Sequence, residues 1–237
     1  MQEKFLKIDM HVHTKGVSKC SIVAVKDAID FKKADGYDGF VLTNHCQSHY
    51  YPPSRHAEYI EGVIEEFERA KAYGAKRGFK VFLGLEVTVF DPFYSDWLLY
   101  GVTEAFLRST PCLYKLTQRE LYKLCHDAGV LLVQAHPYRS NTGYCEDMKP
   151  GYADALDGLE INCTHGDFLT KDKVLRWAKE RGKLVTCGMD YHGPSDRVKG
   201  GTFLPDWVNT SEDIAKYLKE TSQTELFFGA ETLTVSK

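Results

Sequence analysis

Histidine and carboxylate side chains follow several short apolar runs of this sequence. The first run ends in Asp9-Met-His11-Val-His13, and alternation along an extended segment turns His11 and His13 to the same side. Two imidazoles on one side can bind a single metal ion. Four later runs end in the same residue types, as Thr43-Asn44-His45, Gly84-Leu85-Glu86, Gln134-Ala135-His136-Pro137 and Gly188-Met189-Asp190-Tyr191-His192.

Each of these residues alone has an ordinary structural explanation, such as a surface histidine or a paired glutamate. Together, five histidines and two carboxylates at the ends of separate runs indicate one site. Imidazoles combined with carboxylates suit zinc, manganese or iron. Seven ligands exceed the needs of one tetrahedral ion, and a carboxylate can bridge two ions. Two ions about 3.5–4 Å apart are a common arrangement for phosphoester hydrolysis.

The charge of such a site differs from that of the whole chain. The 237 residues include 30 Lys and Arg against 33 Asp and Glu, a formal net charge of −3. Neutral imidazoles with Glu86 and Asp190 contribute two negative charges, so two divalent ions would leave the pocket at about +2. We therefore expect the pocket to favour an anionic group such as phosphate.

The elements that must position these residues alternate between apolar runs and amphipathic stretches. Continuous apolar runs are typical of parallel strands covered on both faces, and their repetition with helices predicts an α/β protein. Thr117 and Glu120 form a capping box for one helix, and other helices follow Ser54, Thr170 and Ser211. The predicted strands are Phe5–Met10, Gly39–Thr43, Lys80–Leu85, Trp97–Val102, Val130–Ala135, Gly158–Ile161 and Lys183–Cys187.

Composition excludes several other classes of protein. No window reaches the 18 apolar residues of a membrane span, and the N-terminal residues do not resemble a signal peptide. The near-neutral charge balance and the lack of a basic stripe argue against a nucleic-acid partner. Seven scattered cysteines without a C-x-x-C pair indicate reduced thiols, so we expect a cytoplasmic protein. With no linker-like stretch, residues 1–237 are predicted to form a single domain.

The ordered motifs DMHVHT, LTNH, GLEV, QAHPYR and GMDYHG resemble those of the PHP (polymerase and histidinol phosphatase) superfamily, and they span most of the chain. The resemblance implies a distorted (β/α)7 barrel, similar to a TIM barrel, with the metal site at the C-terminal ends of the strands. It also implies phosphoesterase activity with two or three divalent ions, Glu86 as the bridging carboxylate, and one ion shared by His11 and His13. The ligands it implies are His11, His13, His45, Glu86, His136, Asp190 and His192.

The sequence departs from the family pattern at two ligands. Many members carry an acidic residue or a histidine shortly after H-x-H, whereas the segment from Thr14 to Cys20 has neither. Cys20 could substitute, although a bystander thiol is the favoured interpretation. A histidine before the H-P motif is also missing, and Asp96 is either its replacement or a solvated loop residue. Both departures put a full three-ion site in doubt.

Polar residues near the predicted ligands could contact substrate. The Arg139 guanidinium could clamp a phosphate and stabilise transition-state charge, which would make it catalytic as well as substrate-binding. A surface arginine paired with a carboxylate is the alternative, and Arg197 is a weaker candidate for the same role. Glu160 and Asn162 end a predicted strand, and we expect them to support the ligands or to touch substrate.

The sequence thus predicts a divalent-metal-dependent phosphoesterase that hydrolyses a small phosphomonoester through a metal-bound hydroxide. It lacks the G-x-S-x-G, Walker A and G-x-G-x-x-G signatures, so serine-hydrolase, triphosphate and dinucleotide chemistry have no local support. Two alternatives stay open: a nuclease-type phosphodiesterase, and a non-catalytic metal-binding barrel with an incomplete site.

Overall fold

The structure, a computed structural model, describes residues 4–139, 149–164, 168–194 and 198–237. Among these residues, no helix combines the length and the apolar character needed to cross a membrane. The strands and α-helices follow in the order β1 (Phe5–Val12), α1 (Val25–Ala34), β2 (Gly39–Leu42), β3 (His45–Cys46), α2 (His56–Arg77), β4 (Lys80–Val89), β5 (Ser95–Tyr100), α3 (Glu104–Ser109), α4 (Gln118–Asp127), β6 (Leu131–Gln134), β7 (Gly158–Asn162), α5 (Phe168–Arg181), β8 (Leu184–Gly188), β9 (Gly200–Pro205), α6 (Ser211–Glu220), β10 (Gln223–Phe228) and β11 (Glu231–Ser236).

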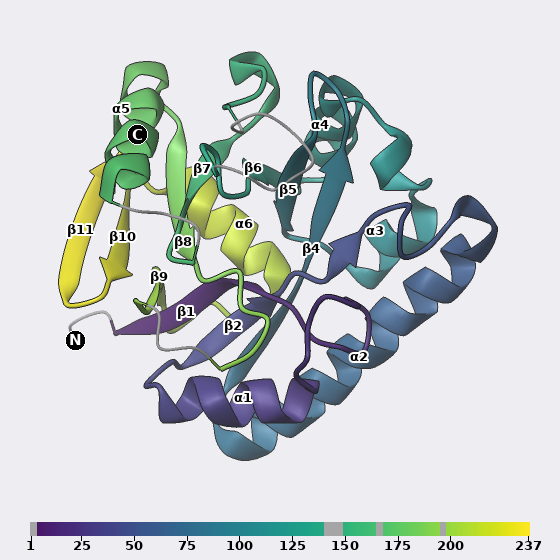
Figure 1. Ribbon diagram of the computed structural model, residues 1–237. Helices are drawn as coiled ribbons and strands as arrows, with labels where there is room; N and C mark the ends of the chain where they lie inside the picture. The colour runs from purple at the N-terminus through teal and green to yellow at the C-terminus, as the bar shows by residue number, and fades with distance from the viewer. Residues whose placement is uncertain (1–3, 140–148, 165–167, 195–197) are drawn as a thin grey trace.

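The strands form one sheet that curls into a nearly closed barrel (Figure 1). Its order is β11-β10-β9-β1-β2-β4-β5-β6-β7-β8, and β3 pairs with β4 beside this path. β1, β2 and β4 are mutually parallel neighbours, as are β6, β7 and β8. A parallel bridge between Val12 and Tyr191 joins the end of β1 to the chain just after β8. The ends of several parallel strands therefore meet at one rim.

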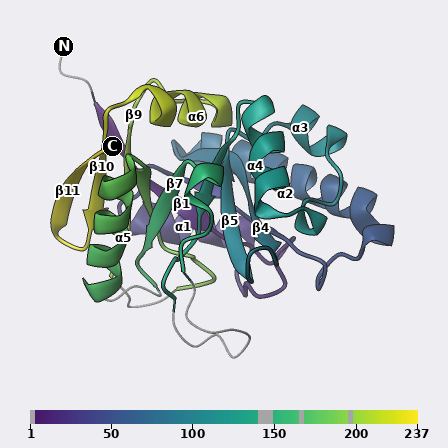
Figure 2. The same cartoon turned by 90° about the horizontal axis from the view of Figure 1, so that it is seen from above.

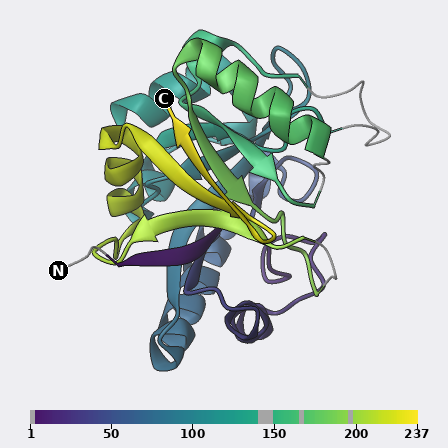
Figure 3. The same cartoon turned by 90° about the vertical axis from the view of Figure 1, so that its left-hand side faces the viewer.

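Three strands extend the sheet beyond β1 (Figure 3). β9 runs antiparallel to β1, and β10 and β11 form an antiparallel hairpin next to β9. Any side chain at Gly201 would collide with the Ile8 carbonyl, so the glycine allows β9 to lie close against β1. These strands were not expected from the sequence.

Two apolar clusters hold the barrel together. The outer cluster lies between the sheet and the helices that surround it (Figure 2). The inner cluster fills the barrel with alternate residues of its strands, among them Phe82 of β4 and Leu98 of β5. Ile214 and Leu218 of α6 belong to this inner cluster, so α6 closes one end of the barrel. The opposite end is left for polar side chains.

An irregularity in β1 changes which face of the sheet its last residues occupy. Ile8 and Met10 pack in the inner cluster, but Val12 packs in the outer one, so the alternation changes phase between them. The register with β2 shifts at the same place, between Asp9 and Val12, as a β-bulge does. Bulges commonly re-aim side chains next to functional sites.

The expectation that all predicted strands run parallel was wrong for the fourth of them. β5 is antiparallel to both β4 and β6. Only residues 90–94 connect β4 to β5, and a parallel crossover needs a dozen or more residues. The connection is therefore a hairpin, and the first residues of β5 lie at the same end of the barrel as the last residues of β4.

The helix signals were largely confirmed. Thr117 and Glu120 form the expected capping box of α4, and Thr210 caps α6 in the same way. Thr170 does not begin its helix, because α5 already starts at Phe168.

Candidate metal centre

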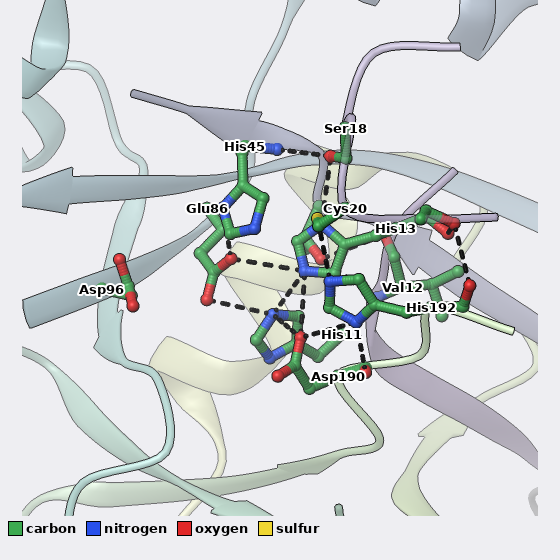
Figure 4. A network of polar contacts seen from close by, with 12 residues as sticks. His11, Val12, His13, Ser18, Cys20, His45, Glu86, Asp96, Asp190 and His192 are labelled. Carbon is green, nitrogen blue, oxygen red and sulfur yellow. Dashed lines mark hydrogen bonds and ion pairs between the residues drawn. The ribbon is translucent and has the colours of Figure 1, made fainter. Parts of the chain in front are cut away.

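His11 and His13 face each other at the centre of the site, with their Nε2 atoms 3.0 Å apart (Figure 4). The His11 Nδ1 atom lies 3.0 Å from a carboxylate oxygen of Glu160, which accepts its proton. The His13 Nδ1 atom donates to Ser18 Oγ at 3.2 Å, because the hydroxyl proton of Ser18 goes to Asn44 Oδ1. In the neutral tautomers that these partners select, both Nε2 atoms carry lone pairs. Two lone pairs that face each other are satisfied by a cation between them.

Glu86 and Asp190 complete a buried group of four ligand atoms around this point. The Glu86 oxygens lie 3.2 Å from His11 Nε2 and 3.3 Å from His13 Nε2, and Asp190 Oδ1 lies 3.4 Å and 3.1 Å from the same two nitrogens. Nitrogen and oxygen ligands about 2.0–2.1 Å from a tetrahedral zinc stand about 3.3–3.4 Å from one another. The observed separations of 3.0–3.4 Å are close to the edges of such a tetrahedron, so these residues fit a divalent ion.

A second buried group consists of Glu86, Asp96 and His136. His136 Nε2 lies 3.1 Å from Glu86 Oε1 and 3.9 Å from Asp96 Oδ2. Asp96 reaches this rim because β5 is antiparallel, which pairs it with Thr88 near the end of β4. The Glu86 carboxylate touches ligand atoms of both groups, so it lies where a bridging carboxylate would be.

A third group joins His13, Cys20, His45 and His192. His192 Nε2 lies 3.0 Å from Cys20 Sγ, and the His13 ring is stacked at 4.4 Å on each of the other two imidazoles. His45 Nδ1 is 2.8 Å from Glu86 Oε2, although neither atom makes a well-oriented hydrogen bond. The His192 side chain is 32% exposed and Cys20 is exposed, so this group lies on the solvent side.

The sequence favours Cys20 as a bystander thiol, but the structure brings its sulfur into contact with the predicted ligand His192. Burial raises the pKa of this thiol, but hydrogen bonds with His192 and His45 outweigh burial and lower the pKa to about 5.

Buried carboxylates control the ionisation of the imidazoles. Burial alone would lower the pKa of His11, but the charges of Glu160, Glu86 and Asp190 raise it well above its usual value. Burial opposes ionisation of Glu86 as well, but the imidazoles of His45 and His11 hold the pKa of its carboxyl well below the usual range. The site therefore carries negative charge that either protons or metal ions can neutralise.

The charge of the pocket differs from the expectation of about +2. That value counted only the carboxylates of Glu86 and Asp190, but Glu160 and Asp96 are also buried beside the ligands. With all four ionised and the imidazoles neutral, two divalent ions would only balance the carboxylates. Burial raises the pKa of Asp96, which limits its charge. A clearly positive pocket therefore requires a third ion or a nearby arginine.

Two of the predicted ligands have unusual backbone geometry. His136 has φ +28° and Asp190 has φ +49°, values that cost a non-glycine residue about 1–3 kcal/mol. The His136 amide donates to Glu160 Oε2 at 2.9 Å, and the Tyr191 amide donates to the His11 carbonyl at 3.0 Å. These bonds hold the strained residues in place, as is typical of functional sites.

Asp9 ties the ends of β1 and β8 together beneath the site. Its Oδ1 atom accepts from the His11 amide at 3.1 Å and from the Met189 amide at 3.0 Å, and its Oδ2 atom pairs with the buried Lys32 of α1. Sequence reasoning missed this pair. The available signal was a lysine on the apolar face of α1, where its neighbours include Ile29.

The remaining expectations have different outcomes. Glu160 accepts hydrogen bonds from the predicted ligands His11 and His136, and Asn162 donates to it at 3.0 Å. Arg139 is half-buried in the turn after His136, and in the described part of the chain its side chain has no hydrogen bond or ion pair with the ligand groups. Arg197 lies outside the described residues.

No protein-family model matches the sequence, and no curated protein matches it. Solved structures do match the fold. A two-domain protein of Bacteroides vulgatus, described as containing a predicted PHP-like metal-dependent phosphoesterase, superposes with a TM-score of 0.67 at 17% identity. That match covers 97% of this chain and 66% of the Bacteroides protein, so this chain spans just under two thirds of its length.

Two further structures are similar along nearly their whole length. PsfC of Pseudomonas syringae has a TM-score of 0.66 at 19% identity, over 97% of this chain and 93% of its own. An amidohydrolase of Chromobacterium violaceum, with bound sulfate and no metal, has a TM-score of 0.59 at 14% identity, over 95% and 99% of the two chains. At these identities the likeness establishes a PHP-like barrel fold, and the function has to be argued from the site.

Proposed function

We propose that this protein is a divalent-metal-dependent phosphoesterase that hydrolyses a small phosphomonoester. The observation that carries the proposal is the convergence of three ligand groups on one rim of the barrel, with Glu86 shared between two of them and 2.8 Å from His45 of the third. The proposed ligands are His11, His13, His45, Glu86, Asp96, His136, Asp190 and His192.

Each group of residues has a distinct proposed role. Bound divalent ions would activate water and neutralise charge on phosphoryl oxygens. Glu86 and Asp190 supply the negative charge that retains the ions, and Glu160 fixes the His11 ring through its Nδ1 proton. The His192 side chain is 32% exposed, which supports the proposal that substrate enters at the third group.

Two observations favour an oxyanion as the substrate group. The Bacteroides protein of similar fold is described as containing a predicted metal-dependent phosphoesterase, and the Chromobacterium amidohydrolase holds sulfate, which has the shape of phosphate. Arg139 follows the ligand His136 by three residues, and its amide donates to the His136 carbonyl at 3.1 Å. We propose that its guanidinium binds the phosphoryl oxygens, which would offset the carboxylates of the pocket.

The test combines metal analysis with a substrate panel. Purified protein is loaded with Mn²⁺, Zn²⁺ or Fe²⁺, the bound ions are counted, and phosphomonoesters, a phosphodiester and an amide are assayed. We expect two or three ions per chain and the fastest hydrolysis on a phosphomonoester. Less than about one ion per chain with no ester hydrolysis would refute the proposal, and faster hydrolysis of the diester or the amide would reassign the reaction.

Arg139→Ala tests the proposed clamp separately. Loss of one donor that stabilises transition-state charge typically lowers kcat by about 10²–10³-fold. The metal content should stay unchanged, because Arg139 belongs to none of the three ligand groups. Arg119→Ala is the control, since Arg119 pairs with Asp154 on the surface. An unchanged rate for Arg139→Ala would remove the clamp from the mechanism.

A further inference from the structure

The loop after His13 is built to hold Cys20 against the third ligand group. Ser21 Oγ lies 3.1 Å from both the His13 carbonyl and the His192 carbonyl, so it links the two ligand segments directly beside Cys20. The Ile22 amide also donates to the His192 carbonyl at 3.1 Å. These bonds fix the backbone on the C-terminal side of the cysteine.

The His192 ring is oriented toward the sulfur. Its Nδ1 proton goes to the Asp190 carbonyl at 2.8 Å, which leaves the Nε2 lone pair directed at Cys20 Sγ, 3.0 Å away (Figure 4). Thiolate and imidazole ligands of a tetrahedral zinc lie about 2.3 Å and 2.0–2.1 Å from the ion, and therefore about 3.6 Å from each other. A movement of about half an ångström would open the observed contact to that separation.

The segment that ends at Cys20 offers no other ligand of comparable strength. Residues 14–19 contain no Asp, Glu or His, and Ser18 is already committed to His13, Asn44 and the His45 amide. A thiolate among imidazole ligands changes which metal ions the site prefers. Soft sulfur ligands favour zinc and cadmium over manganese or magnesium.

We propose that Cys20, with His45 and His192, binds the outermost metal ion through its thiolate and makes this position selective for thiophilic ions. On binding, the S–H bond breaks, the proton leaves to solvent, and a metal–sulfur bond forms without any change in oxidation state. The inference rests on the proposed metal centre and adds to it one ligand and a metal preference.

Cadmium serves as the probe, because a cadmium–thiolate bond absorbs in the near ultraviolet whereas cadmium bound by imidazole and carboxylate does not. The stripped full-length protein is titrated with Cd²⁺, and absorbance and bound ions are measured together. Cys112→Ser is the matched control, since Cys112 belongs to none of the three ligand groups. Wild type and this control should both develop the thiolate band.

Two variants at the cysteine separate its role from the fold. Cys20→Ser should lose the band and about one bound ion per chain. Cys20→Asp should lose the band, keep the ion, and shift the preference toward Mn²⁺ over Cd²⁺ by at least about tenfold. Circular dichroism matching that of wild type shows that both variants are folded.

The possible failures are distinguishable. If wild type binds Cd²⁺ without a thiolate band, or if Cys20→Ser keeps the band, the Cys20 assignment is wrong while the metal centre stands. If wild type binds no Cd²⁺, Zn²⁺ or Mn²⁺ at all, the metal centre and the cysteine ligand both fail.

Discussion

Glu160 shows how a residue without a metal-ligand role can control the candidate site. One oxygen accepts from His11 Nδ1 at 3.0 Å, and the other accepts from the His136 amide at 2.9 Å and from Asn162 Nδ2 at 3.0 Å. The same carboxylate therefore orients one proposed ligand and holds the strained backbone of another. Such outer partners of metal ligands fix the tautomer and raise the basicity of the ring.

Glu160→Gln should weaken metal binding by about 10–100-fold. The amide keeps the shape of the side chain, but its NH₂ group replaces one of the two oxygens, so either His11 Nδ1 or the His136 amide loses its acceptor, and the negative charge beside His11 is removed. Affinity is measured by competition with a chelator of known strength. Glu104→Gln is the control, because Glu104 is exposed on α3. Equal affinity in wild type and Glu160→Gln would contradict the proposed orientation of His11.

At the residue scale, the sequence predicted which residues come together in the candidate site better than which residues support them. Five histidines, Glu86 and Asp190 follow directly from their positions after apolar runs, because the ends of neighbouring strands converge. Ser18 could not be predicted in the same way, since a serine in a loop has no pattern that marks it as a hydrogen-bond partner of His13. Cys20 depends on a loop conformation that only the folded chain supplies.

At the scale of elements, the direction of β5 was the main error. An apolar run has no direction, so the sequence pattern of Trp97–Val102 predicts one more parallel strand. The five residues between β4 and β5 indicate an antiparallel connection, because they are too few for the crossover that a parallel strand needs. The antiparallel direction of β5 changes the site as well as the topology. It brings Asp96, near the start of β5, to the same end of the barrel as Glu86 and His136. The bulge in β1 is another feature that alternation alone could not reveal.

The link between α1 and the sheet gives a prediction about stability. Lys32→Met would leave the Asp9 carboxylate buried without its partner, which typically costs about 3–5 kcal/mol. Lys32 also lies over the rings of Tyr37 and Tyr191, at 4.5 Å and 4.2 Å. The free energy of unfolding is measured in urea, with the exposed Lys33→Met as control. Equal losses in the two variants would show that the Asp9–Lys32 pair does not hold β1 and β8.

The position of α6 gives a second prediction at this scale. Ile214 is fully buried in the inner cluster, so Ile214→Ala should lower the free energy of unfolding by about 2–5 kcal/mol. Metal affinity should change little, because α6 packs with Ala215 beside Gly101, at the opposite end of β5 from the candidate ligand Asp96. Chemical denaturation and a metal titration test the two parts, with the exposed Lys216→Ala as control. A large loss of metal affinity would mean that α6 positions the ligands.

For the whole molecule, the candidate site places four buried carboxylates and several imidazoles within one end of the barrel. The overall charge of −3 is small, whereas these buried carboxylates are concentrated in one part of the fold. Without ions, the imidazoles must take up protons or leave the carboxylates unbalanced. Ions that bind the folded chain and not the unfolded chain therefore stabilise the protein.

Metal removal should consequently lower the melting temperature of wild type, and added Zn²⁺ should restore it. At a free concentration of about 100 times the Kd, one ion contributes about 2.7 kcal/mol. The measurement is thermal unfolding by circular dichroism, on stripped protein with increasing Zn²⁺. Glu86→Gln should respond much less, because Glu86 faces ligand atoms of all three groups, whereas Glu104→Gln should respond like wild type. If stripping and reloading leave the melting temperature of wild type unchanged, the ions contribute nothing to folding, and the close approach of His11 and His13 must be maintained by protonation alone.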